Sequence, residues 1–211
     1  MKVLPDNFND MLSSDRKDRF RQQIEFILEV DKLKSVLRKT ILMDRSRREN
    51  SSEHSWHIAL MVFILSEYAK NSEVDMFRVM KILLVHDLIE IDAGDTYCYD
   101  DQGRKDQSQR EKIAADRIFN LLPADQAALL RELWDEFEER NTPESKFANA
   151  MDRFQPFLNN YFTKGQIWQE NSIKSAQVKS RMQPVDDGAS ILWDYVNSLI
   201  ADGVKKGYLT E

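Results

Sequence analysis

Three ionisable residues lie inside one of the most apolar stretches of this chain. The segment KILLVHDLIEI, residues 81–91, places His86, Asp87 and Glu90 among aliphatic side chains. A carboxylate buried in an apolar interior without a partner is strongly destabilising, or it takes up a proton instead. Residues 82–91 contain no lysine or arginine, so the positive charge that balances these acids must come from elsewhere in the fold.

Two sources of that positive charge are open. Glu90 follows His86 by one helical turn and Asp87 by three positions, so all three side chains can project toward one side of a helix. A divalent metal ion bound there is the more economical source, and a salt bridge to a distant arginine is the alternative. Mixed imidazole and carboxylate donors suit Mn, Fe, Co, Ni or Zn, whereas Mg avoids nitrogen.

The composition indicates a helical globular protein. With 42% hydrophobic and 31% charged residues, the 211-residue chain has a globular balance and is long enough for a sizeable core. Six glycines and five prolines are few for turn-rich β structure, so an all-α single domain is expected over residues 1–211. The net charge of −6 argues against a nucleic-acid-binding protein, which normally carries a basic excess.

Hydrophobic periodicity and capping residues predict where the helices lie. We expect helices over residues 13–38, 51–70, 74–91, 107–122, 123–137, 142–162 and 188–204, with residues 168–183 ambiguous. Ser13 or Ser14 would cap the first helix, and Ser51 or Ser52 would cap the second. Thr142 would cap the sixth helix, with a proline at the first helical position, where it is favoured.

A long polar loop is predicted over residues 92–109, and loops of this length are often functional. It contains the single cysteine, Cys98, whose acidic neighbours would raise the pKa of its thiol, so a nucleophilic role is not expected. One cysteine cannot form an intrachain disulfide, and a reducing cytoplasm is the expected compartment. No apolar run has the length of a signal peptide or a membrane span, so no membrane partner is expected.

Several short motifs carry a resemblance to a known family. The chain contains SEHS at residues 52–55, HD at residues 86–87 and AMDR at residues 150–153, within the longer phrases RRENSSEHSWHIAL, HDLIEIDAGDTY and ANAMDRFQP. Together with DKLKSVLR, these resemble the HD-domain metal-dependent phosphohydrolases, in the branch of the bacterial 5′-deoxynucleotidases and similar HD-domain-containing proteins of animals. The resemblance spans roughly residues 26–162 and implies a single helical HD-domain bundle with a metal site between helices.

The resemblance implies one divalent metal ion with four protein ligands. These ligands are His54, His86, Asp87 and Asp152. Four protein ligands on a six-coordinate ion leave one position for water and one for a phosphate oxygen, and the ion would act as a Lewis acid that activates the water. The remaining histidine, His57, is one turn after His54 and is interpreted as packing or supporting a ligand, with ligation as the alternative.

The resemblance also implies roles for four further residues. Glu90 would orient or deprotonate the attacking water, and Asp95 would lie near the sugar or the nucleophile, although a turn or cap role also suits Asp95. Arg38 matches an arginine of the related nucleotidases, on their first conserved helix, that would hold the phosphate through its planar fork. Lys39, also expected to bind the substrate, follows Arg38 where those proteins carry a bulky aromatic residue, which leaves the choice between deoxyribose and ribose open.

Two other groups of residues have a simpler interpretation. Arg45, Arg47 and Arg48 form a second basic cluster, for which a solvated loop and a binding role are both open. Trp56 and Phe63 are expected in the core rather than as platforms for a nucleobase.

The leading hypothesis is therefore a metal-dependent phosphomonoesterase, a 5′-nucleotidase acting on deoxynucleoside or nucleoside 5′-monophosphates. A second hypothesis keeps the site and changes the substrate to a nucleoside triphosphate, a cyclic nucleotide or a phosphorylated metabolite. A third is a non-catalytic helical binding module. A homodimer is expected by resemblance alone.

Overall fold

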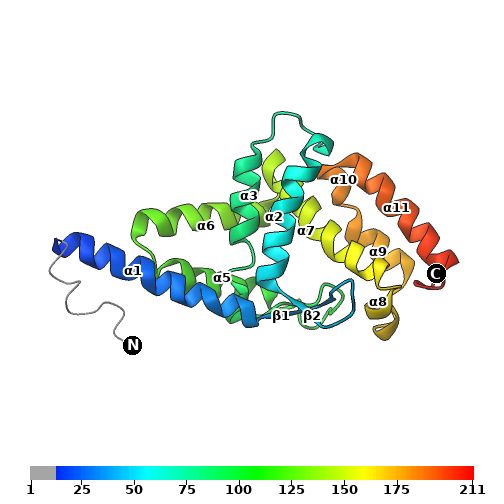
Figure 1. Cartoon of the computed structure of the whole chain (residues 1–211), viewed down its shortest axis with the longest axis horizontal. Helices are drawn as coiled ribbons and strands as arrows, with labels where there is room; N and C mark the ends of the chain where they lie inside the picture. Colours follow the sequence, from blue (N-terminus) through cyan, green and yellow to red (C-terminus); the bar gives the residue numbers. More distant parts are fainter. Residues whose placement is uncertain (1–12) are drawn as a thin grey trace.

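The computed structural model describes residues 13–211 and shows helices arranged around one long central helix, α7 (Pro143–Phe162) (Figure 1). The helices that pack against α7 include α2 (Ser51–Leu65), α3 (Met76–Val85) and α6 (Ala124–Glu139). These four helices contribute much of the hydrophobic core.

The remaining elements flank this group. In chain order they are α1 (Ser14–Val30), η2 (Asp31–Ser35), β1 (Leu37–Ile41), β2 (Arg48–Asn50), η3 (Ser66–Tyr68), α4 (Glu90–Ala93), α5 (Gln107–Phe119), α8 (Gln166–Glu170), α9 (Ser175–Met182), α10 (Val185–Gly188) and α11 (Ser190–Lys205). The two strands pair antiparallel, with Leu37 opposite Asn50 and Ile41 opposite Arg48. Because this sheet has only two short strands in a helical chain, the predicted all-α class is confirmed.

Helix α7 carries the centre of the hydrophobic core. Phe147 and Met151 on this helix are fully buried, in one cluster with Ile58 of α2 and Ile82 of α3. Thr142 caps α7 through a capping box, as predicted, and satisfies backbone N–H groups that the first turn would otherwise leave unpaired. Because the cap fixes where α7 begins, it also fixes the positions of the side chains that α7 directs toward α2 and α3.

The predicted first helix is wrong at its C-terminal end. α1 stops at Val30, η2 follows, and Arg38 lies on strand β1 instead of a helix. The helical pattern of residues 31–38 is overridden because β1 pairs with β2. Hydrophobic periodicity within one segment does not reveal such pairing between two segments. Alternation along β1 buries Thr40 and leaves Lys39 exposed, so Arg38 projects to the same face as Thr40.

The predicted third helix is also interrupted. α3 ends at Val85, and a tight turn follows before α4, with the N–H of Leu88 donating to the carbonyl of Val85 and the N–H of Glu90 to that of Asp87. These bonds span three residues instead of four, which winds the chain more tightly than an α-helix. The turn brings the polar positions of this apolar segment to one side.

The cap of α2 is Asn50, and not Ser51 or Ser52 as predicted. The Asn50 side chain accepts from the N–H of Glu53, and the Glu53 side chain accepts from the N–H of Asn50. This capping box leaves the hydroxyl of Ser51 without a capping role, and it is used inside the candidate site instead.

Two aromatic residues differ from their predicted positions. Trp56 and Phe63, expected in the core, are 63% and 66% exposed on α2. Trp134 and Trp168 are buried in the core, so the ambiguous stretch from residue 168 belongs to the folded body through α8 and α9. Among the described residues, no helix combines the length and the apolar character that crossing a membrane requires.

Candidate metal centre

α2 supplies His54, whose side chain is completely buried. The Nδ1 atom of His54 lies 2.9 Å from Oε1 of Gln155, and Nε2 of Gln155 donates to Oε1 of Glu49 at 2.7 Å. Because Nε2 of the Gln155 amide donates to Glu49, the amide oxygen faces His54 and accepts a hydrogen bond from Nδ1–H. The Nε2 atom of His54 therefore carries the lone pair in the neutral ring, and it lies 3.1 Å from Oδ1 of Asp152.

His86, at the end of α3, is oriented in the same way. Its Nδ1 atom donates to the carbonyl oxygen of Leu83 at 2.7 Å, since a carbonyl can only accept. Its Nε2 atom is buried and has no hydrogen-bond partner among the described residues, although Oδ1 of Asp87 lies 3.0 Å away and Oδ1 of Asp152 3.7 Å away.

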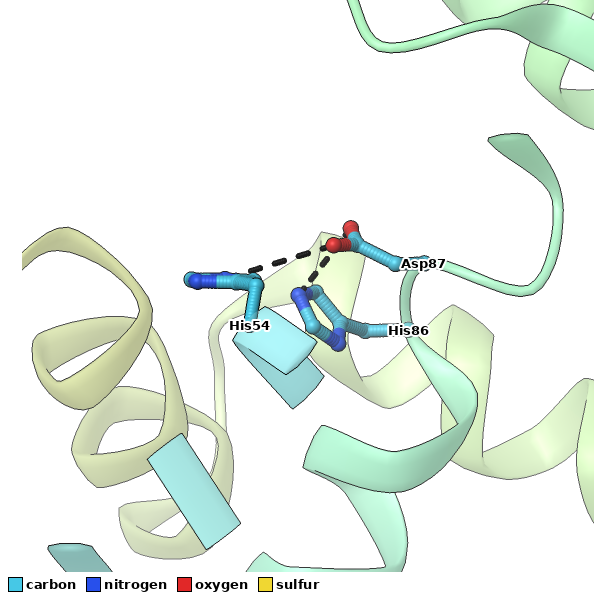
Figure 2. A group of neighbouring side chains, drawn as sticks. All are labelled: His54, His86 and Asp87. Atoms are coloured by element: carbon cyan, nitrogen blue, oxygen red, sulfur yellow. Dashed lines mark ion pairs between the residues drawn. The ribbon is translucent and has the colours of Figure 1, made fainter. Parts of the chain in front are cut away.

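Figure 2 shows His54, on the α2 ribbon, pointing toward the His86–Asp87 pair that follows α3. One ligand atom from each of these three residues lies within 4.8 Å of the others. Oδ2 of Asp87 is 4.0 Å from Nε2 of His54. Asp152 of α7 approaches both imidazoles, so the structure brings together all four residues predicted to be metal ligands.

This arrangement fits a bound divalent cation. Two imidazole lone pairs directed at carboxylate oxygens repel unless a proton or a cation lies between them. The Nδ1 atom of each histidine already has a hydrogen-bond partner, the Gln155 amide for His54 and the Leu83 carbonyl for His86, as is usual for imidazoles that bind metals. The set of two nitrogen and two carboxylate donors suits a transition metal better than Mg.

The pKa values follow from the same geometry. Burial disfavours the charged imidazolium of His86, but Asp87 and Asp152 outweigh burial and raise its pKa above the usual value. Burial also disfavours the Asp152 carboxylate, yet contacts with His54 and His86 hold its pKa well below the usual range. The carboxylate of Asp152 is therefore charged throughout the neutral range.

Glu90 lies beside the four grouped residues and is also buried. The hydroxyl of Ser51 donates to Oε2 of Glu90 at 2.5 Å, and Nη1 of Arg38 lies 3.7 Å from Oε1. Burial and the neighbouring Asp87 carboxylate raise the pKa of Glu90 well above its usual value. A carboxylate with a raised pKa accepts a proton more readily near neutral pH.

Arg38 inserts its guanidinium among these acids from strand β1. Nη1 donates to Oδ2 of Asp87 at 2.7 Å and lies 3.9 Å from Oδ1 of Asp95. Burial disfavours the charge on Arg38, but Asp87 and Glu90 outweigh burial and raise its pKa. Its buried Nε has no hydrogen-bond partner among the described residues, so a donor remains available for a ligand.

Asp95 and Lys39 meet at the rim of the site. The backbone N–H of Lys39 donates to Oδ2 of Asp95 at 3.3 Å, whereas the Lys39 side chain is exposed. Gly94 precedes Asp95 with φ of +73°, a conformation that glycine adopts easily and that turns the chain back after α4. The structure thus brings Asp95 to the site, while Lys39 reaches it through its backbone.

Two cavities adjoin these residues. One, of about 330 Å³, is lined by His86, Asp87, Glu90 and Asp152 together with residues of α5 and α6. The other, of about 90 Å³, lies on the side of Asp95 and is lined by tyrosines of the 92–109 loop and by Trp168. Burial raises the pKa of the Cys98 thiol at the border of both cavities, in line with a non-nucleophilic role.

Sequence reasoning missed the residues that orient the predicted ligands. Gln155, Glu49 and Ser51 act through contacts that are remote in sequence, and only Gln155, one turn after Asp152 in the matched phrase ANAMDRFQP, gave a usable signal. His57 lies 3.4 Å from the same Gln155 amide, consistent with support of a ligand.

Two members of the second basic cluster make structural contacts. Arg45 donates to the carbonyl of Thr163 at 2.7 Å, and Arg47 pairs with Glu53 in the capping box of α2. These contacts account for both side chains without a ligand.

Comparison with known proteins agrees with the geometry. The family model described as HD domain matches residues 30–193. The chain belongs to the HD domain family. The match extends past residue 162, where the sequence resemblance ended, and so includes α8, α9 and α10.

Individual relatives show the same relationship. The crystal structure of a predicted metal-dependent phosphohydrolase from Magnetospirillum magnetotacticum MS-1 superposes with a TM-score of 0.89 at 45% identity, covering 93% of this chain and 98% of that one. The human 5′-deoxynucleotidase HDDC2 is 30% identical over 139 residues, 65% of this chain and just under two thirds (66%) of its own length. The protein of the same name from Dictyostelium discoideum is 31% identical over 131 residues, 60% of this chain and 69% of that protein.

Metal retention should depend on pH through His86. A protonated imidazole cannot bind a metal, and the raised pKa of His86 means that protons compete from above its ordinary value of about 6.5. The apparent Kd for the metal should therefore rise as the pH falls through the raised pKa, well before Asp152 protonates. Equilibrium dialysis over a series of free metal concentrations at each pH, followed by elemental analysis, measures this. An apparent Kd that stays constant from pH 8 to about pH 5 would show that the imidazoles are not ligands.

Proposed function

We propose that this protein is a metal-dependent phosphomonoesterase that releases orthophosphate from nucleoside 5′-monophosphates, with deoxynucleotides as the favoured class. The observation that carries this proposal is the pair of imidazole Nε2 atoms directed at Asp87 and Asp152, beside the buried Arg38. The similarity to proteins named 5′-deoxynucleotidase supports the choice of substrate.

One divalent ion would be held by His54, His86, Asp87 and Asp152, with Mn, Co, Ni, Fe or Zn favoured over Mg. When bound, such an ion supplies a Lewis acid and lowers the pKa of water. The protein's own contribution includes fixing the two imidazoles through the contacts of Gln155 with His54 and of Leu83 with His86.

Arg38 and Glu90 would act on the reacting groups. The planar guanidinium of Arg38, with a free Nε donor, binds phosphate oxygens and neutralises their charge. Glu90, held by the hydroxyl of Ser51, orients the attacking water and accepts its proton as the new bond to phosphorus forms. The ester bond between phosphorus and the 5′-oxygen breaks, and the leaving oxygen takes up a proton.

Asp95 and Lys39 would contact the remainder of the substrate. Asp95 faces Arg38 and the smaller cavity, which also contains aromatic side chains, and this is where the sugar would lie. Lys39, exposed at the rim, would approach the substrate from outside; it stands where the related nucleotidases carry a bulky aromatic residue.

Two alternatives use the same residues differently. A nucleoside triphosphate, a cyclic nucleotide or another phosphorylated metabolite would occupy the same centre. A non-catalytic binding module would need none of the ordered donors, yet both histidines are oriented and Glu90 is buried beside them.

Hydrolysis of a panel of phosphorylated substrates, with Mn, Co, Ni and Mg tested separately, decides between these proposals. Deoxynucleoside 5′-monophosphates should be the best substrates. Glu90→Gln should lower kcat by about 10²- to 10⁴-fold with metal content unchanged, because it removes the proton acceptor and keeps the side-chain shape.

The matched control is Glu25→Gln on α1, a carboxylate outside both cavities, which should retain activity. Loss of the metal in Glu90→Gln would instead make Glu90 a ligand. A metal-loaded protein that hydrolyses no member of the panel would contradict the enzymatic proposal.

We further propose that residues 1–211 form one HD domain that works in the cytoplasm as a homodimer. Residues 1–12 lie outside the described part of the chain. The dimer is supported by an exposed apolar face on the neighbouring helices α2 and α3, where Trp56, Phe63, Ile64 and Phe77 are each more than 60% exposed. Exposed apolar surface of this extent is typical of interaction sites.

Phe63→Ser should weaken this dimer, because it removes a large apolar side chain from the exposed face of α2. Sedimentation velocity across a concentration series measures the effect. The control is Ile191→Ser, which removes an exposed apolar side chain from α11 and should leave the dimer intact. A wild-type protein that remains monomeric at high concentration would rule the dimer out.

A further inference from the structure

Four arginines from different elements line a cavity next to the candidate metal centre. Arg104 precedes α5, Arg140 ends α6, Arg153 lies on α7 and Arg181 lies on α9. Asp101 is the one carboxylate that lines the same cavity. None of the four arginines forms an ion pair with another residue of the described range 13–211, in contrast to Arg38, which donates to Asp87. The cavity wall therefore carries an excess of positive charge.

Arg153 is the least expected member of this group, because its side chain is only 6% exposed. Its Nη1 donates to the backbone carbonyl of Arg181 at 2.8 Å, and its Nε is buried without a hydrogen-bond partner among the described residues. Arg181 and Arg140 add like charge nearby. Asp152 acts on Arg153 electrostatically but forms no ion pair with it among the described residues. A buried cation with a free donor and no ion-pair partner is unfavourable unless a ligand supplies one.

The arginine-lined cavity shares lining residues with the cavity at the candidate metal centre. Arg104, Arg140 and Arg181 also line the larger cavity that contains His86 and Asp87. Cys98 of the long loop borders both. An anionic group held by these arginines would therefore lie beside a phosphate bound at the metal centre, and not on a remote surface.

We propose that Arg140, Arg153 and Arg181, with Arg104 at the rim, form a second oxyanion site that binds a phosphate group. Guanidinium groups match phosphate oxygens with paired N–H donors, and several arginines from different helices can surround a tetrahedral anion. The phosphate is either a second phosphate of the substrate or free inorganic phosphate. The first source rests on the proposed function, whereas the site itself does not.

Calorimetric titration of the metal-loaded protein with inorganic phosphate tests the site. The wild type should bind two phosphates per chain. Arg181→Gln and Arg140→Gln should each weaken one of them roughly 10- to 100-fold, because hydrogen bonds from charged groups to an anion are lost. Arg16→Gln, an exposed arginine of α1 away from both cavities, is the control and should bind as the wild type does. A wild type that binds no phosphate, or arginine variants that bind phosphate as tightly as the wild type does, would overturn the proposal.

Kinetics then distinguish the two sources. If the second phosphate belongs to the substrate, Arg181→Gln should raise KM for a nucleoside 3′,5′-bisphosphate roughly tenfold more than it raises KM for the 5′-monophosphate. If the source is free phosphate, both substrates should respond alike in KM, while the loss of the second phosphate in the titration still supports the site. A protein that hydrolyses no nucleotide but still loses a phosphate in the arginine variants would refute the proposed function and leave the oxyanion site standing.

Discussion

The burial of several carboxylates in one small region is the constraint on which the rest of the structure depends. Asp87 and Glu90 are buried in the helical core with two imidazoles, Asp152 is half-buried beside them, and Asp95 lies at the edge. Carboxylates held this closely in a medium of low polarity raise one another's pKa unless positive charge lies among them. Arg38 supplies one positive charge. The Nε2 atoms of His54 and His86 face inward, and their lone pairs would bind a metal cation that supplies further positive charge.

The fold supplies this region by fixing three chain segments at their ends. The Asn50 capping box starts α2 three residues before His54 and leaves Ser51 free to bind Glu90. A tight turn after α3 brings His86 and Asp87 inward. The central helix α7 presents Asp152 and, one turn later, Gln155, which sets the tautomer of His54. The helix cap, the tight turn and the Gln155 hydrogen bond thus determine the geometry of the site, and packing against α7 holds them in place.

The sequence predicted the members of the site better than it predicted the elements that hold them. The sequence pointed to His86, Asp87 and Glu90 because ionisable residues in an apolar segment need partners. The resemblance to a known family pointed to His54 and Asp152. The strand that carries Arg38 could not be found, because it exists only through pairing with β2. Gln155 and the arginine-lined cavity depend on helices that meet only in three dimensions.

The most direct test of the account is to locate the metal. Anomalous diffraction from crystals of the metal-reconstituted protein, collected on both sides of the absorption edge, should show one strong peak per chain between His54, His86, Asp87 and Asp152. Replacement of His86 by alanine should remove that peak. A peak at another position, or reconstituted crystals with no peak at these residues, would contradict the claim that a metal ion balances the buried carboxylates.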